Sequence, residues 1–256
     1  MNFKMKKTAL MMGLLGALIV PTSSASMLAI EAGIMDWSDS TEDYFGDGKS
    51  ENEFVTIKGA TGSAFGDVYA RLKLEDFTDA DMIGSEINII GQINMGESDF
   101  NWYGQVFSKQ KPTWSETNTL LGFSHDKTWD NGWYTQVAVA GHVVTSYYNH
   151  FSKPDGEKFD ANGFNGGYAY LAVNKSFSAL NQDFTFGWWQ EHYFGRGDDY
   201  LVVSGDIEDH GFNGQATLRW HLAGGLSTAI QYRYAQNNLG KEGWQNAIFY
   251  SMQYNF

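Results

Sequence analysis

The sequence contains no cysteine, only 3 prolines and few basic residues. Without cysteine it cannot carry the disulfides that many secreted domains use, which suits a fold closed by backbone pairing. Lysine and arginine number 17 against 30 aspartates and glutamates, so the formal net charge is -13. Nucleic-acid binding requires a basic stripe. We therefore expect no nucleic-acid partner.

The chain also lacks a long apolar run outside its N-terminus. Residues 1–26 combine a lysine-rich start, the uncharged stretch Thr8–Val20 and the small residues of Pro21–Ser26. That order is typical of a cleaved secretory signal peptide, and the apolar stretch is shorter than the roughly 20 residues of a membrane-spanning helix. We expect one mature domain, residues 27–256, which is either a soluble protein or a β-barrel because no run in it is long enough to span as a helix.

Aromatic residues make up 16% of the chain and glycines number 29, a composition that favours the barrel. The clearest pattern is in Trp244–Phe256, where alternate positions are apolar and the positions between them are mostly small or polar. A period of two predicts a strand with one face toward lipid. The apolar positions are Phe256, Tyr254, Met252, Tyr250 and Ile248. A terminal phenylalanine resembles the signal that the barrel-insertion machinery recognises, so we expect that partner and outer-membrane lipid.

About twelve stretches of this kind follow one another, and their connections alternate between long and short. Asp130-Asn131-Gly132 is the strongest hairpin signal among the short ones. We predict an all-β fold: a transmembrane antiparallel up-and-down β-barrel of about 12 strands, with short periplasmic turns and long extracellular loops. Closure requires the first strand, Met27–Asp36, to pair with the last. A soluble all-β fold is the alternative, but it gives no reason for the alternating connections.

The polar faces of the predicted strands should line a narrow aqueous lumen, because a barrel of this size is wider than one filled by its own side chains. Charged residues of both signs occur there, and aromatic residues could stack on flat solutes. Alternatively, the charges only stabilise the interior, and the aromatic residues pack beneath loops or belong to a girdle. The candidate lumen residues are Phe54, Tyr69, Arg71, Lys73, Glu75, Glu86, Tyr103, Trp189, Arg219, Gln231, Arg233 and Phe249.

An outer-membrane enzyme is a competing interpretation, since it would need a nucleophile, a histidine and a carboxylate close together. No G-x-S-x-G motif occurs, and we expect no enzymatic activity. The pairs that could be quoted for such a site are His125 with Asp126, His142 with Ser146, and His192 with Glu191.

The chain has two long acidic loops, Trp37–Ser50 and Gly195–Asp209, and the second raises two further interpretations. Arg196-Gly197-Asp198 would suit an adhesive barrel, although a tripeptide arises readily by chance. Clustered carboxylates favour hard cations such as calcium, but their spacing matches no known loop motif, and a solvated acidic loop explains them better. We expect neither a metal nor a cofactor. The carboxylates are Asp198, Asp199, Asp206, Glu208 and Asp209.

Several stretches resemble the nucleoside-specific channel-forming outer-membrane proteins, the Tsx family and its OmpK-like relatives. They are Trp37–Phe45 (WSDSTEDYF), the strand pair ENEFVTIKGATGSAFGDVYARLKLEDF at 51–77, Ser227–Ala235 (STAIQYRYA) and the terminal FYSMQYNF. The resemblance implies a twelve-stranded barrel in the bacterial outer membrane that passes nucleosides or similar small solutes. It also implies loops that phages or colicins use as receptors. A structural or receptor barrel without specific transport is the alternative.

Overall fold

The structure is a computed structural model and describes residues 26–49, 51–148 and 153–256. The predicted signal peptide lies outside these residues apart from Ser26, and it stays a prediction. The described chain forms twelve strands, in agreement with the predicted number. They are β1 (Ser26–Trp37), β2 (Asn52–Ser63), β3 (Gly66–Glu75), β4 (Gly84–Asn94), β5 (Phe100–Lys111), β6 (Trp114–Thr128), β7 (Trp133–Tyr148), β8 (Gly163–Ala179), β9 (Gln182–Phe194), β10 (Gly211–His221), β11 (Leu226–Gln236) and β12 (Trp244–Asn255).

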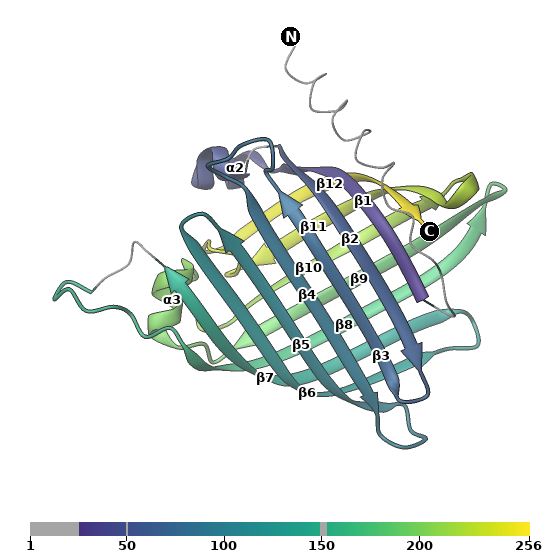
Figure 1. Ribbon diagram of the computed structural model, residues 1–256, viewed down its shortest axis with the longest axis horizontal. Helices are drawn as coiled ribbons and strands as arrows, with labels where there is room; N and C mark the ends of the chain where they lie inside the picture. The colour runs from purple at the N-terminus through teal and green to yellow at the C-terminus, as the bar shows by residue number, and fades with distance from the viewer. Residues whose placement is uncertain (1–25, 50, 149–152) are drawn as a thin grey trace, which may run out of the picture.

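The strands close into a single antiparallel barrel in which each is hydrogen-bonded to its neighbours in sequence (Figure 1). The closing pair is β1 with β12, in a register that runs from Ala29 opposite Asn255 to Trp37 opposite Ala247. The backbone N–H of Phe256 extends this pairing by donating to the carbonyl of Leu28 at 3.0 Å. The predicted pairing of the first and last strands is therefore confirmed, and the barrel has no free edge.

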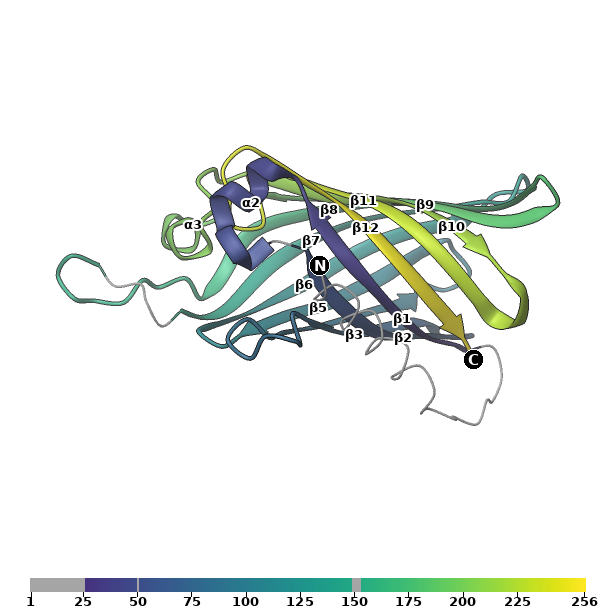
Figure 2. The ribbon, with the colours of Figure 1, turned by 90° about the horizontal axis from the view of Figure 1, so that it is seen from above.

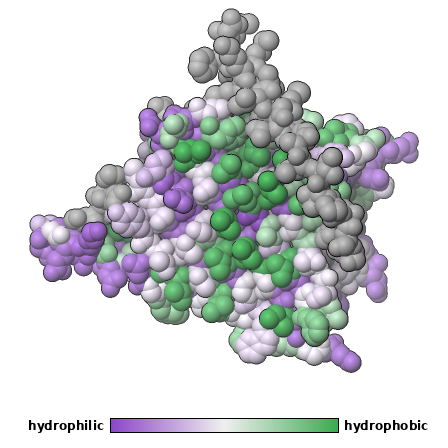
Figure 3. Space-filling model, viewed as in Figure 1, coloured by the Kyte–Doolittle hydropathy of each residue, from purple (hydrophilic) through white to green (hydrophobic). Residues whose placement is uncertain are grey.

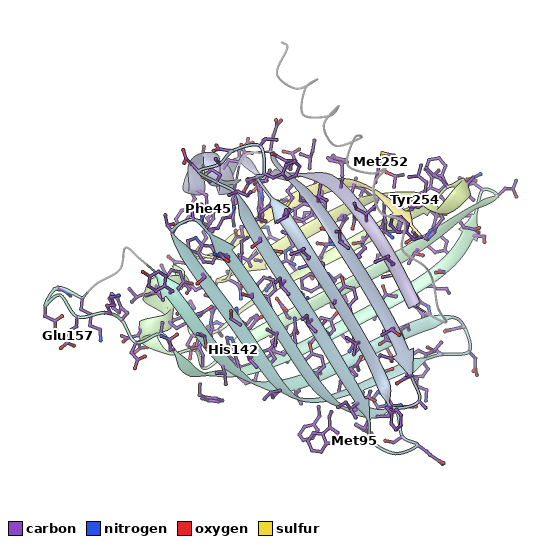
Figure 4. All side chains as sticks on the ribbon, in the orientation of Figure 1. Phe45, Met95, His142, Glu157, Met252 and Tyr254 are labelled. Atoms are coloured by element: carbon purple, nitrogen blue, oxygen red, sulfur yellow. The ribbon has the colours of Figure 1, made fainter. Side chains whose placement is uncertain are left out.

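Alternation along β12 separates an outer from an inner face as predicted. Met252 and Tyr254 stand exposed on the outside of the barrel (Figure 4), whereas Ser251 and Gln253 between them are buried inside it. Apolar side chains form a band across the visible outer surface (Figure 3). Successive side chains of a β-strand point to opposite faces. The inner positions of β12, carried from strand to strand by the pairing registers, therefore identify the inner positions of all the other strands.

Short turns connect the strands at one end of the barrel, which we call the turn end. The predicted turn at Asp130-Asn131-Gly132 joins β6 to β7, and Gly132 adopts the left-handed φ of +82° that this turn needs. The β8–β9 connection is a two-residue turn at Leu180 and Asn181, because both strands continue up to it. Both residues have positive φ, which gives the turn the twist of a tight hairpin without glycine. The short η3 (Ala223–Gly225) lies in the β10–β11 turn.

Two short helices, α2 (Asp39–Phe45) and α3 (Asp198–Ser204), lie at the opposite end, which we call the loop end (Figures 1 and 2). α2 continues into η2 (Gly46–Lys49) within the first long acidic loop. Residues 200–203 of the second acidic loop are helical, as part of α3. Only residues 112 and 113 separate β5 from β6, so the loop expected there is a tight turn. In the described part of the chain, no helix has the length and apolar character to cross a membrane.

Candidate functional site: the barrel lumen

All twelve candidate residues lie on the inner face of the barrel, as the pairing registers require. Their accessibility differs, however. Phe54 and Tyr103 are only 5% and 3% exposed, because neighbouring side chains cover them, so neither ring is free to stack on a solute in this conformation. Tyr69, Trp189 and Phe249 remain partly exposed. Whether any of the twelve binds a solute stays a prediction.

One side of the lumen is lined by tyrosines from β5, β8 and β9. The rings of Tyr103 and Tyr168 are stacked, with centroids 6.5 Å apart, and Tyr168 stacks in the same way on Tyr170. Tyr193 meets Tyr168 edge-on at 5.2 Å. These rings pack with Leu120 in a cluster whose centre is fully buried. The lumen is therefore narrowed on this side by an aromatic wall.

The aromatic wall also carries polar groups with fixed partners. Tyr168 donates its hydroxyl to one carboxylate oxygen of Glu191 at 3.1 Å, and the Asn213 amide donates to the other at 2.7 Å. Tyr103 donates to the Gln105 side-chain oxygen at 2.5 Å. These bonds satisfy the tyrosine hydroxyls that burial would otherwise leave unpaired.

Beside the aromatic wall, near the loop end, acidic and basic side chains form a ladder across β3, β4 and β5, so that β5 contributes to both. Lys109 lies 2.7 Å from Glu75 and 3.1 Å from Glu86, and Lys73 also contacts both carboxylates. Lys111 continues the ladder to Glu75 and to Asp76 beyond the end of β3. Arg71 contacts Glu86 at 3.4 Å. Every charge of the ladder thus has an opposite partner.

A second charged group, the Glu31 cluster, bridges strands on both sides of the barrel closure. Lys58 lies 2.7 Å from one oxygen of Glu31 and Arg219 lies 2.9 Å from the other. The oxygen that contacts Arg219 also accepts hydrogen bonds from Ser251 at 2.6 Å and Gln231 at 3.3 Å. Of its five members, the sequence indicated Arg219 and Gln231 as lumen residues. Glu31 was visible only as a lone charge in an apolar strand.

Near the loop end, the lumen holds two cations on aromatic rings. The Arg233 guanidinium lies 4.6 Å from the ring centre of Trp189, and the Lys49 ammonium lies 4.2 Å from that of Trp37 and 4.0 Å from that of Phe45. Lys49 also donates to the Gln245 side-chain oxygen at 2.8 Å. Burial without a carboxylate contact lowers the pKa of Lys49 well below its usual value.

The remaining sequence motifs serve the loops. Arg196 is 1% exposed at its side chain and pairs with Asp206 at 2.5 Å, while it also donates to the carbonyls of Glu208 and Asn237. This ties the loop containing α3 to the β11–β12 loop. Because Arg196 is buried, the Arg196-Gly197-Asp198 tripeptide presents no arginine to an adhesive partner. Among the described residues, no group of three or more histidines and acids is arranged to hold a metal ion.

The histidines considered for an enzyme lie apart. His142 is fully buried between the Asn118 side-chain oxygen and the Asn165 carbonyl, His125 lies 3.9 Å from Asp99, and His192 faces outward beside Gln190. In the described structure, none of the three is hydrogen-bonded to a serine hydroxyl. The geometry therefore offers no serine–histidine pair for nucleophilic catalysis.

Sequence reasoning missed several lumen residues. Lys109 shares the parity of Tyr103 on β5, and Tyr168 and Tyr170 alternate on β8, so a closer reading of these strands could have found all three. Lys49 gave no such signal, because it lies in a loop and reaches the lumen only through contacts with residues far along the chain.

Solved structures of outer-membrane channels match this chain to different degrees, and one of them has a TM-score above 0.5. The porin NanC has the same fold with a TM-score of 0.54 at 11% identity, covering 90% of this chain and 100% of that one. The KdgM porin gives a TM-score of 0.46 at 10% identity, over 91% of this chain and 99% of that one. An outer membrane channel from Pseudomonas putida F1 gives 0.47 at 9% identity, over 94% and 98%.

The sequence itself matches a protein family over nearly its whole length. The family described as nucleoside-specific channel-forming protein, Tsx, matches residues 33–256. This match includes the charged ladder, the aromatic wall, all twelve candidate residues and every member of the Glu31 cluster except Glu31 itself. The chain is accordingly an outer-membrane channel for small solutes, and it belongs to the Tsx family of nucleoside-specific channel-forming proteins.

Proposed function

We propose that the solutes passing through this lumen are nucleosides. The observation that carries the proposal is a group of flat side chains, Tyr170, Trp189 and Arg233, which are partly exposed to the lumen beside Glu191. The rings of Tyr170 and Trp189 have centroids 6.5 Å apart, tilted by 30°. A purine or pyrimidine base can stack on such a surface, whatever its identity, because every base has a flat π-face.

Glu191 supplies the second half of the recognition. It lies opposite Tyr170 in the β8–β9 register and next to Trp189 by two positions on β9. An ionised carboxylate has about four acceptor positions, of which Tyr168 and Asn213 each occupy one. The remaining positions can accept hydrogen bonds from ribose hydroxyls while the base lies on the rings. Family membership supports the same class of solute.

Conductance measurements on the purified protein in planar bilayers test this proposal. Nucleosides added to the bath should block the ion current in a concentration-dependent manner. Replacing Trp189 with alanine should raise the half-blocking concentration by roughly tenfold or more, because base–aromatic stacking contributes about 1–3 kcal/mol.

Trp188 provides a matched control, because it is the same residue type one position earlier and faces outward, where its ring nitrogen donates to the Tyr234 hydroxyl at 2.8 Å. The Trp188→Ala variant should keep the native half-blocking concentration. A current that nucleosides never block, or equal block in the two variants, would contradict the proposal.

A further inference from the structure

The basic side chains of the lumen fall into two groups. Six of them have a carboxylate oxygen within 4.0 Å, namely Lys58, Arg71, Lys73, Lys109, Lys111 and Arg219. The other two, Lys49 and Arg233, have no such partner among the described residues. We call these two the mouth pair. Both side chains are only partly exposed to water, and a charge partly withdrawn from water is costly unless something pairs with it, so the mouth pair needs an explanation.

The mouth pair occupies one place in the barrel. Arg233 is opposite Ala247 in the β11–β12 register, and Ala247 is opposite Trp37 in the β12–β1 register. Neighbouring strands are about 4.8 Å apart, which puts the backbones of Arg233 and Trp37 roughly 10 Å apart. Lys49 lies over the ring of Trp37. The two cations therefore flank the small, buried side chain of Ala247 from opposite sides.

Neutral groups and aromatic rings hold both cations in place but leave donors unused. Arg233 donates to the Asn213 side-chain oxygen at 2.5 Å, and Lys49 donates to Gln245 and more weakly to the Leu239 carbonyl at 3.4 Å. An arginine carries five N–H donors and a lysine three. The buried ring nitrogen of Trp37 is a further donor without a hydrogen-bond acceptor in the described structure.

The acidic groups that act on the mouth pair are already engaged, Glu75 and Glu86 of them in the ladder. Glu191 is held by Tyr168 and Asn213, and Asp206 is held by Arg196 and by the backbone N–H of Gly240 at 2.9 Å. A purely structural role would explain why side chains fill these positions, but a neutral residue could fill them without placing two like charges near each other. The charges themselves are explained if an anion comes to them.

We propose that the mouth pair is a binding subsite for an anionic group, a phosphate or a carboxylate, carried by a solute whose flat ring lies on Trp189. The inference rests on the proposed function and deepens it: the channel prefers phosphorylated nucleosides to neutral ones. Lys49 and Arg233 contact the anionic group.

Current block by uridine and by uridine 5′-monophosphate measures this preference directly. In a partly screened lumen, each cation should lower the half-blocking concentration of the monophosphate by roughly threefold to tenfold. The half-blocking concentration of the monophosphate should therefore be at least about tenfold below that of uridine. Inorganic phosphate should block less well than the monophosphate because it lacks the ring. Equal potency of phosphate and monophosphate would overturn the role given to the ring.

We define the selectivity ratio as the half-blocking concentration of uridine divided by that of the monophosphate. The variants Lys49→Gln and Arg233→Gln remove one charge each and should reduce this ratio by roughly threefold to tenfold. Lys49→Arg and Arg233→Lys retain the charge and should retain most of the ratio. Lys241→Gln is the matched control. Lys241 is also a loop cation over an aromatic ring, that of Tyr44, and has no carboxylate partner among the described residues. It differs in that it donates an exposed hydrogen bond to the Ser40 carbonyl. Its ratio should equal that of the native protein.

Salt tests the native protein without any substitution. Raising the salt concentration from 0.1 to 1 M shortens the Debye length from about 10 to 3 Å and should shrink the native ratio. A native ratio near one, or a ratio unchanged by both charge-removing variants, overturns the subsite. If uridine still blocks in that case, the proposed nucleoside channel stands; if neither compound blocks, both proposals fail.

Discussion

The Glu31 cluster and the mouth pair place cations in the same lumen under opposite conditions. In the Glu31 cluster, one carboxylate contacts two cations and accepts two further hydrogen bonds, so the group is internally complete. In the mouth pair, two cations share one place with aromatic rings and neutral acceptors only. The first arrangement holds strands of the barrel closure together, whereas the second leaves charge available. Complete polar groups belong to structure, and incomplete ones are candidates for ligand binding.

The largest effect should come from breaking the complete group. The Glu31→Gln variant leaves Lys58 and Arg219 as buried cations without their carboxylate, and we expect it to lower the free energy of unfolding by about 3 kcal/mol. Urea unfolding in lipid or detergent, followed by tryptophan fluorescence, measures this loss. Ser251→Ala is the control, since it removes a single hydrogen bond to Glu31 and should cost about 1 kcal/mol. Equal costs for the two variants would show that the ion pairs contribute little.

Conversely, the mouth pair can be completed. Gln245 already accepts a hydrogen bond from Lys49, so Gln245→Glu supplies a carboxylate of the same shape at 2.8 Å. Because Lys49 then has a permanent counter-charge, the half-blocking concentration of uridine 5′-monophosphate should rise by roughly tenfold. Asn246→Asp adds the same charge at the next position of β12, which faces outward, and should leave the block near its native value. Identical effects of the two substitutions would indicate a general field effect and not a site.

The comparison also shows what sequence patterns can predict. Alternation is a local property, so twelve strands, their inner and outer faces and the pairing of β1 with β12 could be predicted from residues such as those of Trp244–Phe256. The inward position of Arg233 follows in the same way. The absence of a carboxylate beside it does not, because that depends on which side chains other strands and the loops bring to it. Lys49 illustrates the limit most clearly, since its partner Gln245 is 196 positions away.

Accessibility was equally hidden from the sequence. Phe54 and Tyr103 have inward parity, yet Phe54 packs with Met35, Trp37 and Ala247, and Tyr103 packs with Leu120 and Tyr168. Ala247 of β12 reaches Phe54 only when the barrel closes between β1 and β12, and Tyr168 of β8 reaches Tyr103 of β5 across two intervening strands. Parity can therefore name the residues that face the lumen, but it cannot separate those that touch solute from those that support the wall.

A smaller effect should come from loosening Glu191, which Asn213 links to Arg233. Tyr168→Phe removes the hydroxyl that holds one oxygen of Glu191, so this carboxylate can turn toward Arg233 and compete with a bound anion. We expect the half-blocking concentration of the monophosphate to rise roughly threefold, the equivalent of part of one hydrogen bond. Tyr193→Phe is the control, because Tyr193 contacts the ring of Tyr168 edge-on without holding Glu191. A lower half-blocking concentration in Tyr168→Phe would contradict this account of the site.

The smallest expected effect concerns the pH dependence of stability, and it follows from the lowered pKa of Lys49. Between that lowered pKa and the usual lysine value of 10.5, the unfolded chain holds a proton that the folded chain has released. Stability must then rise with pH over this range, because the unfolded state binds more protons. Lys49→Met removes this titrating group and with it the rise in stability. As the pH increases, the unfolding free energy of the native protein should therefore increase relative to that of the variant. Saturating uridine 5′-monophosphate should flatten the difference, since a bound anion returns the Lys49 pKa toward its usual value. A native slope equal to that of Lys49→Met, with or without the monophosphate, would mean that Lys49 is solvated and that folding does not lower its pKa.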